Sequence, residues 1–418
     1  MTARLDHGWR RRHYTFPTNP TIPNEFARNT EGIAGDKQGR VVHRRSALKL
    51  PLLLGAGAAL GRAPHAAAET GGRWSPDRAN RWYQAQGWLV GSNYIPATAI
   101  NQLEMFQADT FDLRRIDTEL GWARYYGHNT ARVFLHDQLW AQDQKGFQTR
   151  LAQFVGVAAQ HRIKPLFVFF DSCWDPAPRA GRQRAPRPGI HNSGWVQSPG
   201  AERLGDAQYL SVMRDYVTGV LTQFRNDPRI LGWDLWNEPD NPARQYRSAE
   251  RTDKEQLVVN LLPQVFQWAR AVDPSQPLTS GVWHGDAGDP QGRNEISDIQ
   301  LANADVITFH SYAAPAGFES RINELAPLGR PIICTEYMAR TRGSTVGAIL
   351  PIAKRHNVGA INWGLVTGKT QTYFPWDSWD HPYPAIPKVW FHDLLGLDGR
   401  PFAEAEVQAM RTLAAGQA

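Results

Sequence analysis

Short runs of apolar residues alternate with longer stretches in which apolar positions recur at helical spacing. After residue 70, eight of the short runs have strand character: 88–94, 130–135, 165–171, 230–237, 278–283, 306–310, 331–335 and 359–364. Amphipathic stretches lie between several of them, at 147–161, 207–224, 254–272 and 344–356. Near-continuous apolar strands separated by helices are typical of a parallel sheet that is buried on both faces. Eight such units in about 310 residues predict a (β/α)8 barrel.

An open, doubly wound sheet is the alternative that the same alternation allows. That fold would place a glycine-rich phosphate-binding loop after an early strand, and no such motif occurs in the sequence. The pattern therefore favours a single barrel domain over residues 69–418. Two connections are long, residues 172–205 after the third strand and residues 367–387 after the eighth. In a barrel, both would lie at the end that carries the active site.

Residues 1–68 have the pattern of an export signal. Arg44 and Arg45 precede an apolar segment at residues 50–60, and small residues follow at 66–68. This arrangement resembles a twin-arginine signal and predicts a periplasmic or secreted protein. The apolar segment is too short for a stable membrane span, although an uncleaved anchor is the alternative. Residues 1–42 fit either a long polar n-region or a start codon placed too early.

The net charge of +6 suggests a nucleic-acid partner until its distribution is considered. Residues 1–68 contain 11 of the 46 Lys and Arg and 4 of the 40 Asp and Glu, which leaves 35 basic and 36 acidic residues in the remainder. A nearly neutral body offers no electrostatic footprint for a phosphate backbone. We therefore expect no nucleic-acid partner.

The two cysteines, Cys173 and Cys334, are too few for a disulfide framework. They fall near the ends of the third and seventh strands, which lie across the barrel from each other and too far apart for a disulfide. We expect both to be buried free thiols.

Two glutamates carry the candidate chemistry. Glu238 belongs to the segment Trp-Asn-Glu-Pro at 236–239, and Glu336 belongs to Thr-Glu-Tyr at 335–337. Each comes at the end of an apolar strand, and the two are 98 residues apart. Hydrolysis of a glycosidic bond needs two such carboxyl groups, one that protonates the leaving oxygen and one that attacks or activates water.

Both motifs resemble those of clan A glycoside hydrolases, most of all the cellulase family, glycoside hydrolase family 5. The resemblance extends from residue 88 to about residue 395. It implies that Glu238 is the acid/base and Glu336 the nucleophile of a retaining mechanism, with carboxyl groups about 5–5.5 Å apart. It also implies that Asn237 hydrogen-bonds the sugar 2-hydroxyl.

Other strand ends match the clan as well. The resemblance implies that Arg132, on the second strand, holds the nucleophile ionised by its fixed charge. In His-Ser-Tyr at 310–312, Tyr312 would donate a hydrogen bond to Glu336 and His310 would contact sugar. Trp363, after the eighth strand, would form the floor of the −1 subsite.

The third and seventh strands depart from the family pattern. Many family members carry a His near the end of the third strand, where this chain has Asp171; the seventh strand ends in Thr-Glu-Tyr in place of Gly-Glu-Phe. Asp171 and the pair His136 and Asp137 are predicted either to contact sugar or to pair with arginines. Aromatic residues and one His at the predicted strand ends and loops are candidate sugar platforms, with core packing as the alternative for each: Trp174, Trp195, Trp236, Trp283, His284, Trp376 and, less strongly, Asn93 and Tyr94.

The predicted function is an exported retaining β-glycoside hydrolase that acts on an oligosaccharide or polysaccharide of the glucan, mannan or xylan type. A transglycosylase and a non-catalytic carbohydrate-binding protein are the alternatives. We expect no metal and no cofactor, since the sequence has no helical His spacing of a metal site, and no Gly-x-Ser-x-Gly motif of a serine hydrolase. The loop at 172–205 is predicted to form one side of the substrate cleft.

Overall fold

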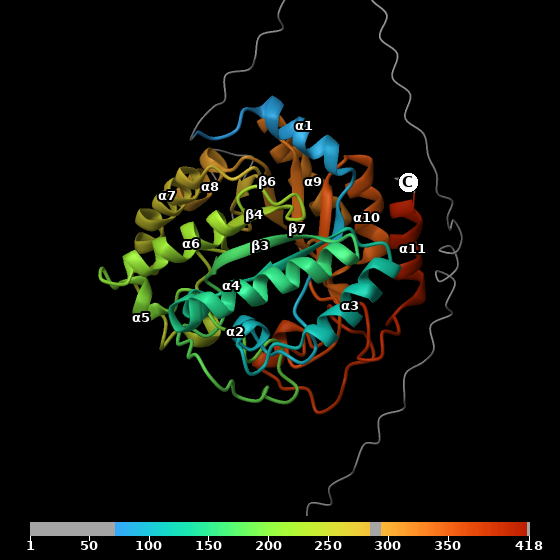
Figure 1. Ribbon diagram of the computed structural model, residues 1–418. Helices are drawn as coiled ribbons and strands as arrows, with labels where there is room; N and C mark the ends of the chain where they lie inside the picture. The colour runs from blue at the N-terminus through green and yellow to red at the C-terminus, as the bar shows by residue number, and fades with distance from the viewer. Residues whose placement is uncertain (1–71, 285–293, 416–418) are drawn as a thin grey trace, which may run out of the picture. The chain divides into compact units, whose positions relative to one another are not determined.

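A computed structural model describes residues 72–284 and 294–415. Eight parallel strands form one sheet in the order β5-β4-β3-β2-β1-β8-β7-β6, and an isolated parallel bridge between Val282 and Phe309 joins the two ends. The predicted (β/α)8 barrel is thereby confirmed (Figure 1). The strands are β1 (Val90–Asn93), β2 (Thr130–Phe134), β3 (Lys164–Asp171), β4 (Gly232–Asn237), β5 (Leu278–Thr279), β6 (Ile307–His310), β7 (Ile332–Tyr337) and β8 (Gly359–Asn362).

Helices surround this sheet and cover its outer face. They are α1 (Pro76–Gln86), α2 (Gln102–Phe106), α3 (Leu113–Tyr125), α4 (Asp137–Gln160), α5 (Ala201–Leu204), α6 (Leu210–Phe224), α7 (Lys254–Val272), α8 (Glu295–Asn303), α9 (Pro315–Leu325), α10 (Val346–Arg355) and α11 (Glu404–Ala415). Several begin at a side-chain cap; Thr345, for example, accepts a hydrogen bond from the backbone N–H of Ala348 at the start of α10. Trp233 of β4 packs against Phe167 of β3 and Phe224 of α6, which joins the sheet to the helix layer.

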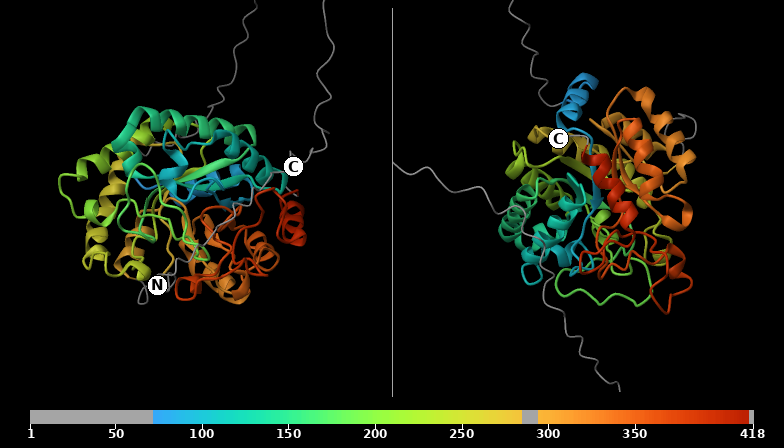
Figure 2. Two further views of the ribbon diagram at one scale, coloured as in Figure 1. Left: turned by 90° about the horizontal axis from the view of Figure 1, so that it is seen from below. Right: turned by 90° about the vertical axis from the view of Figure 1, so that its right-hand side faces the viewer.

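The two ends of the barrel differ. At the end where the strands begin, α1 and Trp74 pack on a cluster that includes Leu89, Leu166 and Ile333. The long loops lie at the opposite end, where the strands finish, as Figure 1 shows. The left view of Figure 2 looks onto that end. Because the strands finish there, their last residues are the ones that the loops surround.

Two strands differ from their predicted ranges. β5 is much shorter than predicted: beyond it, Ser280 Oγ donates to the backbone oxygen of Trp236 (2.8 Å) in β4, and the backbone N–H of Val282 donates to Thr308 (3.0 Å) in β6. β7 is longer and includes Glu336, so this carboxylate projects from the strand itself. Cys173 and Cys334 are both free and buried, as expected.

The predicted export signal at residues 1–68 lies outside the described residues. Within residues 72–284 and 294–415, no helix combines the length and the apolar character that a membrane crossing requires.

Candidate active site

Glu238 lies immediately after β4, where the backbone turns sharply. Its φ of 41° is in the left-handed region, which a residue with a side chain adopts only when the surroundings require it. This turn brings the carboxylate among three partners. Oε1 lies 2.8 Å from Nδ1 of His310, while Oε2 accepts hydrogen bonds from Asn241 Nδ2 (2.7 Å) and Cys173 Sγ (3.2 Å).

Glu336 has a different set of partners. Arg132 Nη1 donates to its Oε1 (2.8 Å), and Tyr312 Oη donates to its Oε2 (2.7 Å). The hydrogen bond that the sequence predicted between Tyr312 and Glu336 is therefore present. Nε2 of His310 lies 3.5 Å from Oε1 of Glu336, so the imidazole ring stands between the two glutamates.

The two carboxylates are close. One oxygen of Glu238, one oxygen of Glu336 and one ring nitrogen of His310 all lie within 4.8 Å of one another. Both glutamates line a cleft and are nearly buried, with 8% of Glu238 and 4% of Glu336 exposed. A substrate atom in the cleft can therefore be in contact with both carboxyl groups.

Arg132 is completely buried and donates all five of its N–H groups. Nη1 donates to Glu336 and to Asn93 Oδ1 (3.0 Å). Nε and Nη2 donate to Asp234 Oδ2 (3.1 and 2.8 Å), and Nη2 also donates to Asn237 Oδ1 (2.7 Å). The guanidinium thereby holds groups from β1, β4 and β7 in fixed positions around β2.

The electrostatic surroundings distinguish the two glutamates. Burial raises the pKa of Glu238; neutral donors on Asn241 and Cys173 counteract this only in part, and the charge of Asp240 adds to it. Burial also raises the pKa of Glu336, and the charge of Glu238 raises it further, but the fixed charge of Arg132 and the Tyr312 hydroxyl lower it. Arg132 and Tyr312 hydrogen-bond Glu336 directly, so Glu336 is the carboxyl group better placed to stay ionised.

His310 is neutral at neutral pH, because burial lowers its pKa to about 4. The sequence predicted a sugar contact for it. The structure places it against Glu238 and also at the surface of the cleft.

Asn237 is engaged by protein groups on both sides of its amide. Its Oδ1 accepts from Arg132, and its Nδ2 donates to Asp171 Oδ1 (2.9 Å) and to Cys173 Sγ (3.4 Å). Asp171 is 1% exposed and does not line the cleft. Asp171 also accepts a hydrogen bond from Trp195 Nε1 (2.6 Å). The two roles predicted for Asp171, a sugar contact and a pairing with an arginine, are therefore not seen. Its carboxylate orients the amide of Asn237.

The pair His136 and Asp137 also has neither predicted role. Both are fully buried and outside the cleft lining. Asp137 accepts hydrogen bonds from Ser198 Oγ (2.7 Å) and Tyr209 Oη (2.8 Å), which joins the start of α4 to neighbouring loops, and its Oδ1 lies 3.0 Å from His136 Nδ1.

The cleft has a volume of about 1240 Å³, larger than the ~300–1,000 Å³ of an ordinary small-molecule pocket. Trp236 and Tyr94 are buried outside it. The aromatic and imidazole groups that line it come from several loops and include most of the predicted platforms: Trp174, Trp195, Trp283, His284, Trp363 and Trp376. Such a lining offers flat apolar surfaces for the CH-rich faces of sugar rings.

Trp363 follows β8 and packs edge-on against Phe134 (5.8 Å between ring centroids) and Trp195 (5.8 Å). It is only half-buried, so one part of the indole faces the cleft, where a floor for a sugar ring was predicted. Trp376 lies edge-on to Tyr312 (5.0 Å), the residue that donates to Glu336.

One side of the cleft is formed by two loops that are far apart in the sequence. We call the β3 loop (residues 172–205) and the β8 loop (residues 363–403) together the cleft wall. Trp174 stacks on Trp379 (5.2 Å), and Trp379 Nε1 donates to the backbone oxygen of His191 (2.8 Å). His191 N in turn donates to Ser378 Oγ (2.9 Å). The right view of Figure 2 shows the green β3 loop beside the red β8 loop.

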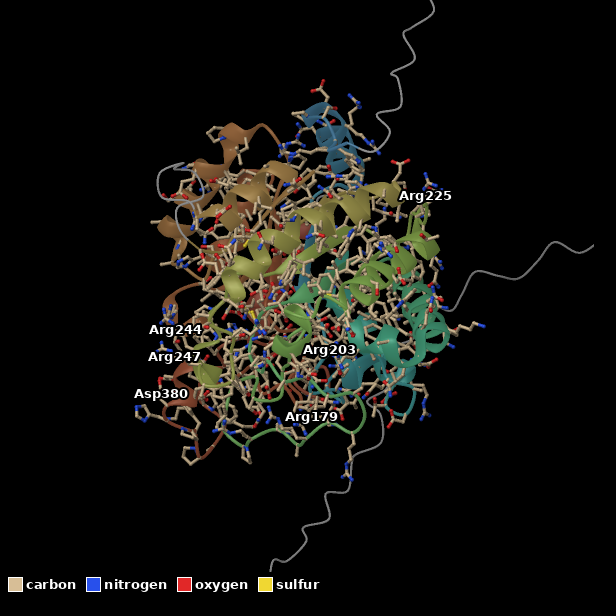
Figure 3. The ribbon with its side chains drawn as sticks, turned by 90° about the vertical axis from the view of Figure 1, so that its left-hand side faces the viewer. Arg179, Arg203, Arg225, Arg244, Arg247 and Asp380 are labelled. Atoms are coloured by element: carbon tan, nitrogen blue, oxygen red, sulfur yellow. The ribbon has the colours of Figure 1, made fainter. Side chains whose placement is uncertain are left out.

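The arginines of the β3 loop avoid mutual repulsion in two ways. Arg184 forms an ion pair with Asp175, and Arg187 lies 5.1 Å above the Trp379 ring. Arg179 is exposed to solvent. Figure 3 shows Arg179 at the loop end of the barrel with Arg244, whereas Arg225 lies toward the opposite end.

Sequence reasoning did not find three polar residues of this site. Asn241 follows the Glu-Pro turn by two residues, Cys173 has the pattern of a structural thiol, and Asp234 lies within an apolar strand motif. Asp234 carried a usable signal, because a buried strand tolerates an aspartate only where a cation faces it.

The residues that could together ligate a cation, among those the structure describes, are Glu238, His310 and Glu336. Arg132 already supplies a positive charge 2.8 Å from Glu336, and a metal ion there would be repelled by it.

A family model described as the TIM barrel domain of glycosyl hydrolases family 2 matches residues 192–351. That segment contains β4 to β7 and both glutamates. With the closed barrel and the paired carboxylates, this match supports a glycosidase on a (β/α)8 scaffold. Its relation to glycoside hydrolase family 5 in particular stays a prediction.

Among solved structures, the chain is similar to an exo-β-1,4-mannosidase from Opitutaceae bacterium strain TAV5, with 18% identity and a TM-score of 0.53, over 79% of this chain and 60% of that one. It is also similar to a single-residue variant of GH5_18 from Streptomyces cattleya in complex with Manβ1-4GlcNAc, with 12% identity and a TM-score of 0.52, over 79% of this chain and 80% of that one. These likenesses show the shared fold. By sequence, no curated protein matches the chain.

Arg132→Lys tests the role of the buried guanidinium. A lysine has three donors in place of five and no planar fork. We expect kcat/KM on an aryl β-glycoside to fall at least about a hundredfold. A lysine keeps the positive charge but loses the Nη1 hydrogen bond that favours the ionised form of Glu336, so the pKa of Glu336 should rise and the acid limb of the pH profile should move to higher pH. Arg225→Lys, at an exposed pair with Asp273, is the matched control. An unmoved acid limb in folded Arg132→Lys would contradict this role.

Proposed function

We propose that this protein is a retaining β-glycoside hydrolase that works by double displacement. The observation that carries the proposal is the close pair of carboxylates, with oxygens within 4.8 Å, of which one faces a fixed cation and the other only uncharged donors. Retaining enzymes keep their two carboxyl groups about 5–5.5 Å apart, since no water has to fit between nucleophile and sugar.

In the first step, Glu336 attacks the anomeric carbon, and the bond to the leaving oxygen breaks as Glu238 gives its proton to that oxygen. The product is a glycosyl ester of Glu336. Arg132 and Tyr312 hold both oxygens of Glu336, which supports its role as the ionised, oriented nucleophile. In the second step, Glu238, now ionised, takes a proton from water, which attacks the anomeric carbon and releases Glu336.

The substrate class that we propose is a β-linked glycan of the glucan, mannan or xylan type. A neutral sugar suits a cleft lined by aromatic rings, and the near-neutral charge of residues 69–418 gives no support for a nucleic-acid partner. β-1,4-Mannosides are the first substrates to assay, since the similar structures carry mannosidase and mannose-disaccharide names.

The roles of the two glutamates are separable by leaving group. Glu336→Ala should abolish turnover of every substrate, because the nucleophile cannot be bypassed. Glu238→Ala should lose about 10²–10⁴-fold on substrates with poor leaving groups but form the glycosyl-enzyme normally from a dinitrophenyl glycoside, which needs little protonation.

Azide identifies which glutamate is which. With Glu238→Ala, azide should attack the glycosyl-enzyme and give the β-glycosyl azide; with Glu336→Ala, it should replace the nucleophile and give the α-azide. An α-azide from Glu238→Ala would show that the roles are exchanged. No turnover of any glycoside by the unmodified protein would favour a carbohydrate-binding protein, and transfer to sugar acceptors in excess of hydrolysis would favour a transglycosylase.

We further propose that the cleft wall limits how many sugar units bind, which favours short oligosaccharides or chain ends. Its support is the set of contacts that fix the β3 loop on the β8 loop beside the cleft. An antiparallel bridge between Asp171 and Ser198 holds the two ends of the β3 loop together, so the segment between Asp175 and Trp195 can be shortened with both ends in place. Shortening should lengthen the products from a polymer and raise kcat/KM on the polymer relative to a disaccharide.

Trp379→Ala is the matched variant for that experiment, because it keeps the loop length and removes the stacking partner of Trp174. It should change product lengths in the same direction, by less. If a stably folded, shortened variant gave unchanged product lengths and an unchanged KM, the cleft wall would have no role in specificity.

We also propose that the protein is exported through the twin-arginine motif at Arg44 and Arg45, which lies outside the described residues. Replacement of both by Lys should retain the full-length chain inside the cell, as seen by fractionation and immunoblotting. Unchanged export of the double variant would contradict the proposal.

A further inference from the structure

Cys173 lies in the cleft beside Glu238, and its hydrogen bonds are directional. The NH2 group of an amide can only donate, and two such groups donate to the sulfur: Asn237 Nδ2 (3.4 Å) and Asn241 Nδ2 (3.5 Å). The acceptor within reach of the thiol hydrogen is Glu238 Oε2 (3.2 Å). Cys173 is therefore a donor to the acid/base.

Other contacts fix the amide orientations on which this assignment depends. Oδ1 of Asn241 accepts from the backbone N–H of Ala243 (2.9 Å), and Oδ1 of Asn237 accepts from Arg132. Each amide nitrogen must then face Cys173. Burial raises the pKa of the Cys173 thiol well above its usual value, so the sulfur keeps its hydrogen at neutral pH.

The two loops that carry these groups are joined by a buried lysine. Lys254 Nζ donates to the backbone oxygens of Ser172 (2.8 Å) and Asn241 (2.8 Å), and to Glu250 (2.7 Å). The three donors of the ammonium group are thereby used. Lys254 thereby fixes the backbone at Asn241 and at Ser172, the residue before Cys173. The contacts of Cys173 and Asn241 with Glu238 are therefore held in place by the fold.

Building on the proposed function, we propose that Cys173 is a positioning residue that, with Asn241, determines which oxygen of Glu238 carries the transferable proton. Both donors point at Oε2, so a proton placed on Oε2 would face two other hydrogens. Oε1 has His310 Nδ1 at 2.8 Å, and a neutral imidazole nitrogen can accept. The proton therefore resides on Oε1, and Oε2 stays an acceptor in both protonation states.

Infrared spectroscopy tests this without a substrate. The chain has two cysteines, so Cys334→Ser leaves Cys173 as the one thiol. Its S–H stretching band should move to lower frequency as Glu238 ionises with rising pH, because an ionised carboxylate accepts a stronger hydrogen bond. In Glu238→Gln the band should not move with pH. A band that is independent of pH in the protein with Glu238 would overturn the proposal.

Kinetics give a second, independent readout. Donors to the ionised carboxylate lower the pKa of Glu238, so Cys173→Ala should raise it and move the basic limb of the kcat/KM profile to higher pH. On alkyl glycosides kcat/KM should fall by about three- to tenfold, and on dinitrophenyl glycosides it should fall by clearly less. Cys173→Ser keeps a donor and should retain most of the activity. Equal losses on both substrate types would assign Cys173 a packing role and overturn the proposal.

Glu238→Gln separates this inference from the proposed function. If it shows no dependence on the leaving group, the acid assignment of Glu238 fails. If it shows that dependence and Cys173→Ala does not, only the positioning role of Cys173 fails. The infrared test in Cys334→Ser decides the matter even where Cys173→Ala does not fold.

Discussion

One buried guanidinium determines the geometry of this site. The five N–H groups of Arg132 donate hydrogen bonds to groups on three other strands. Two of the acceptors are the carboxylates of Asp234 and Glu336. A buried charge is tolerated only when it is paired and fully hydrogen-bonded, and loss of one partner from a buried pair costs about 3–5 kcal/mol. The strand ends therefore cannot move independently: any displacement of β4 or β7 would leave part of this network unsatisfied.

The same network makes two chemically identical side chains unequal. Glu336 accepts hydrogen bonds from the charged guanidinium of Arg132 and from Tyr312. Glu238 faces three groups that are uncharged at neutral pH, which belong to His310, Asn241 and Cys173. Two carboxylates this close disfavour simultaneous ionisation, and the unequal neighbours decide which one holds the proton. This difference follows from where the two residues lie in the fold. Glu336 lies on β7 in direct contact with Arg132, whereas Glu238 lies on the turn after β4.

The sequence was sufficient for the barrel, since its strands are apolar on both faces and the helices between them are amphipathic. It also indicated the strand-end positions of Glu238, Glu336, Arg132 and Tyr312, because strand ends of a barrel converge.

Prediction from the sequence failed where contact depends on exact side-chain direction. Asp171 was predicted to face sugar or an arginine and instead orients Asn237. Cys173 meets Glu238 only because the β3 loop folds over the turn after β4, and spacing along the chain carries no sign of that, whereas Asn241 lies three residues after Glu238 on the same turn. β5 was also predicted too long, since Ser280 was included in it but bonds the backbone of β4 through its side chain.

The cleft wall has a consequence for the order in which the molecule is completed. Its contacts join His191 to Phe374, Ser378 and Trp379, over 183 to 188 positions of sequence. Contacts at such separation form late, because a long stretch of chain must first be brought together. A nascent chain that has reached β7 already contains both glutamates but lacks the β8 loop, so its β3 loop has no surface to stack on. The cleft thus acquires its final shape only when the last quarter of the chain has folded, and a cut within the β8 loop would open the wall without touching either glutamate.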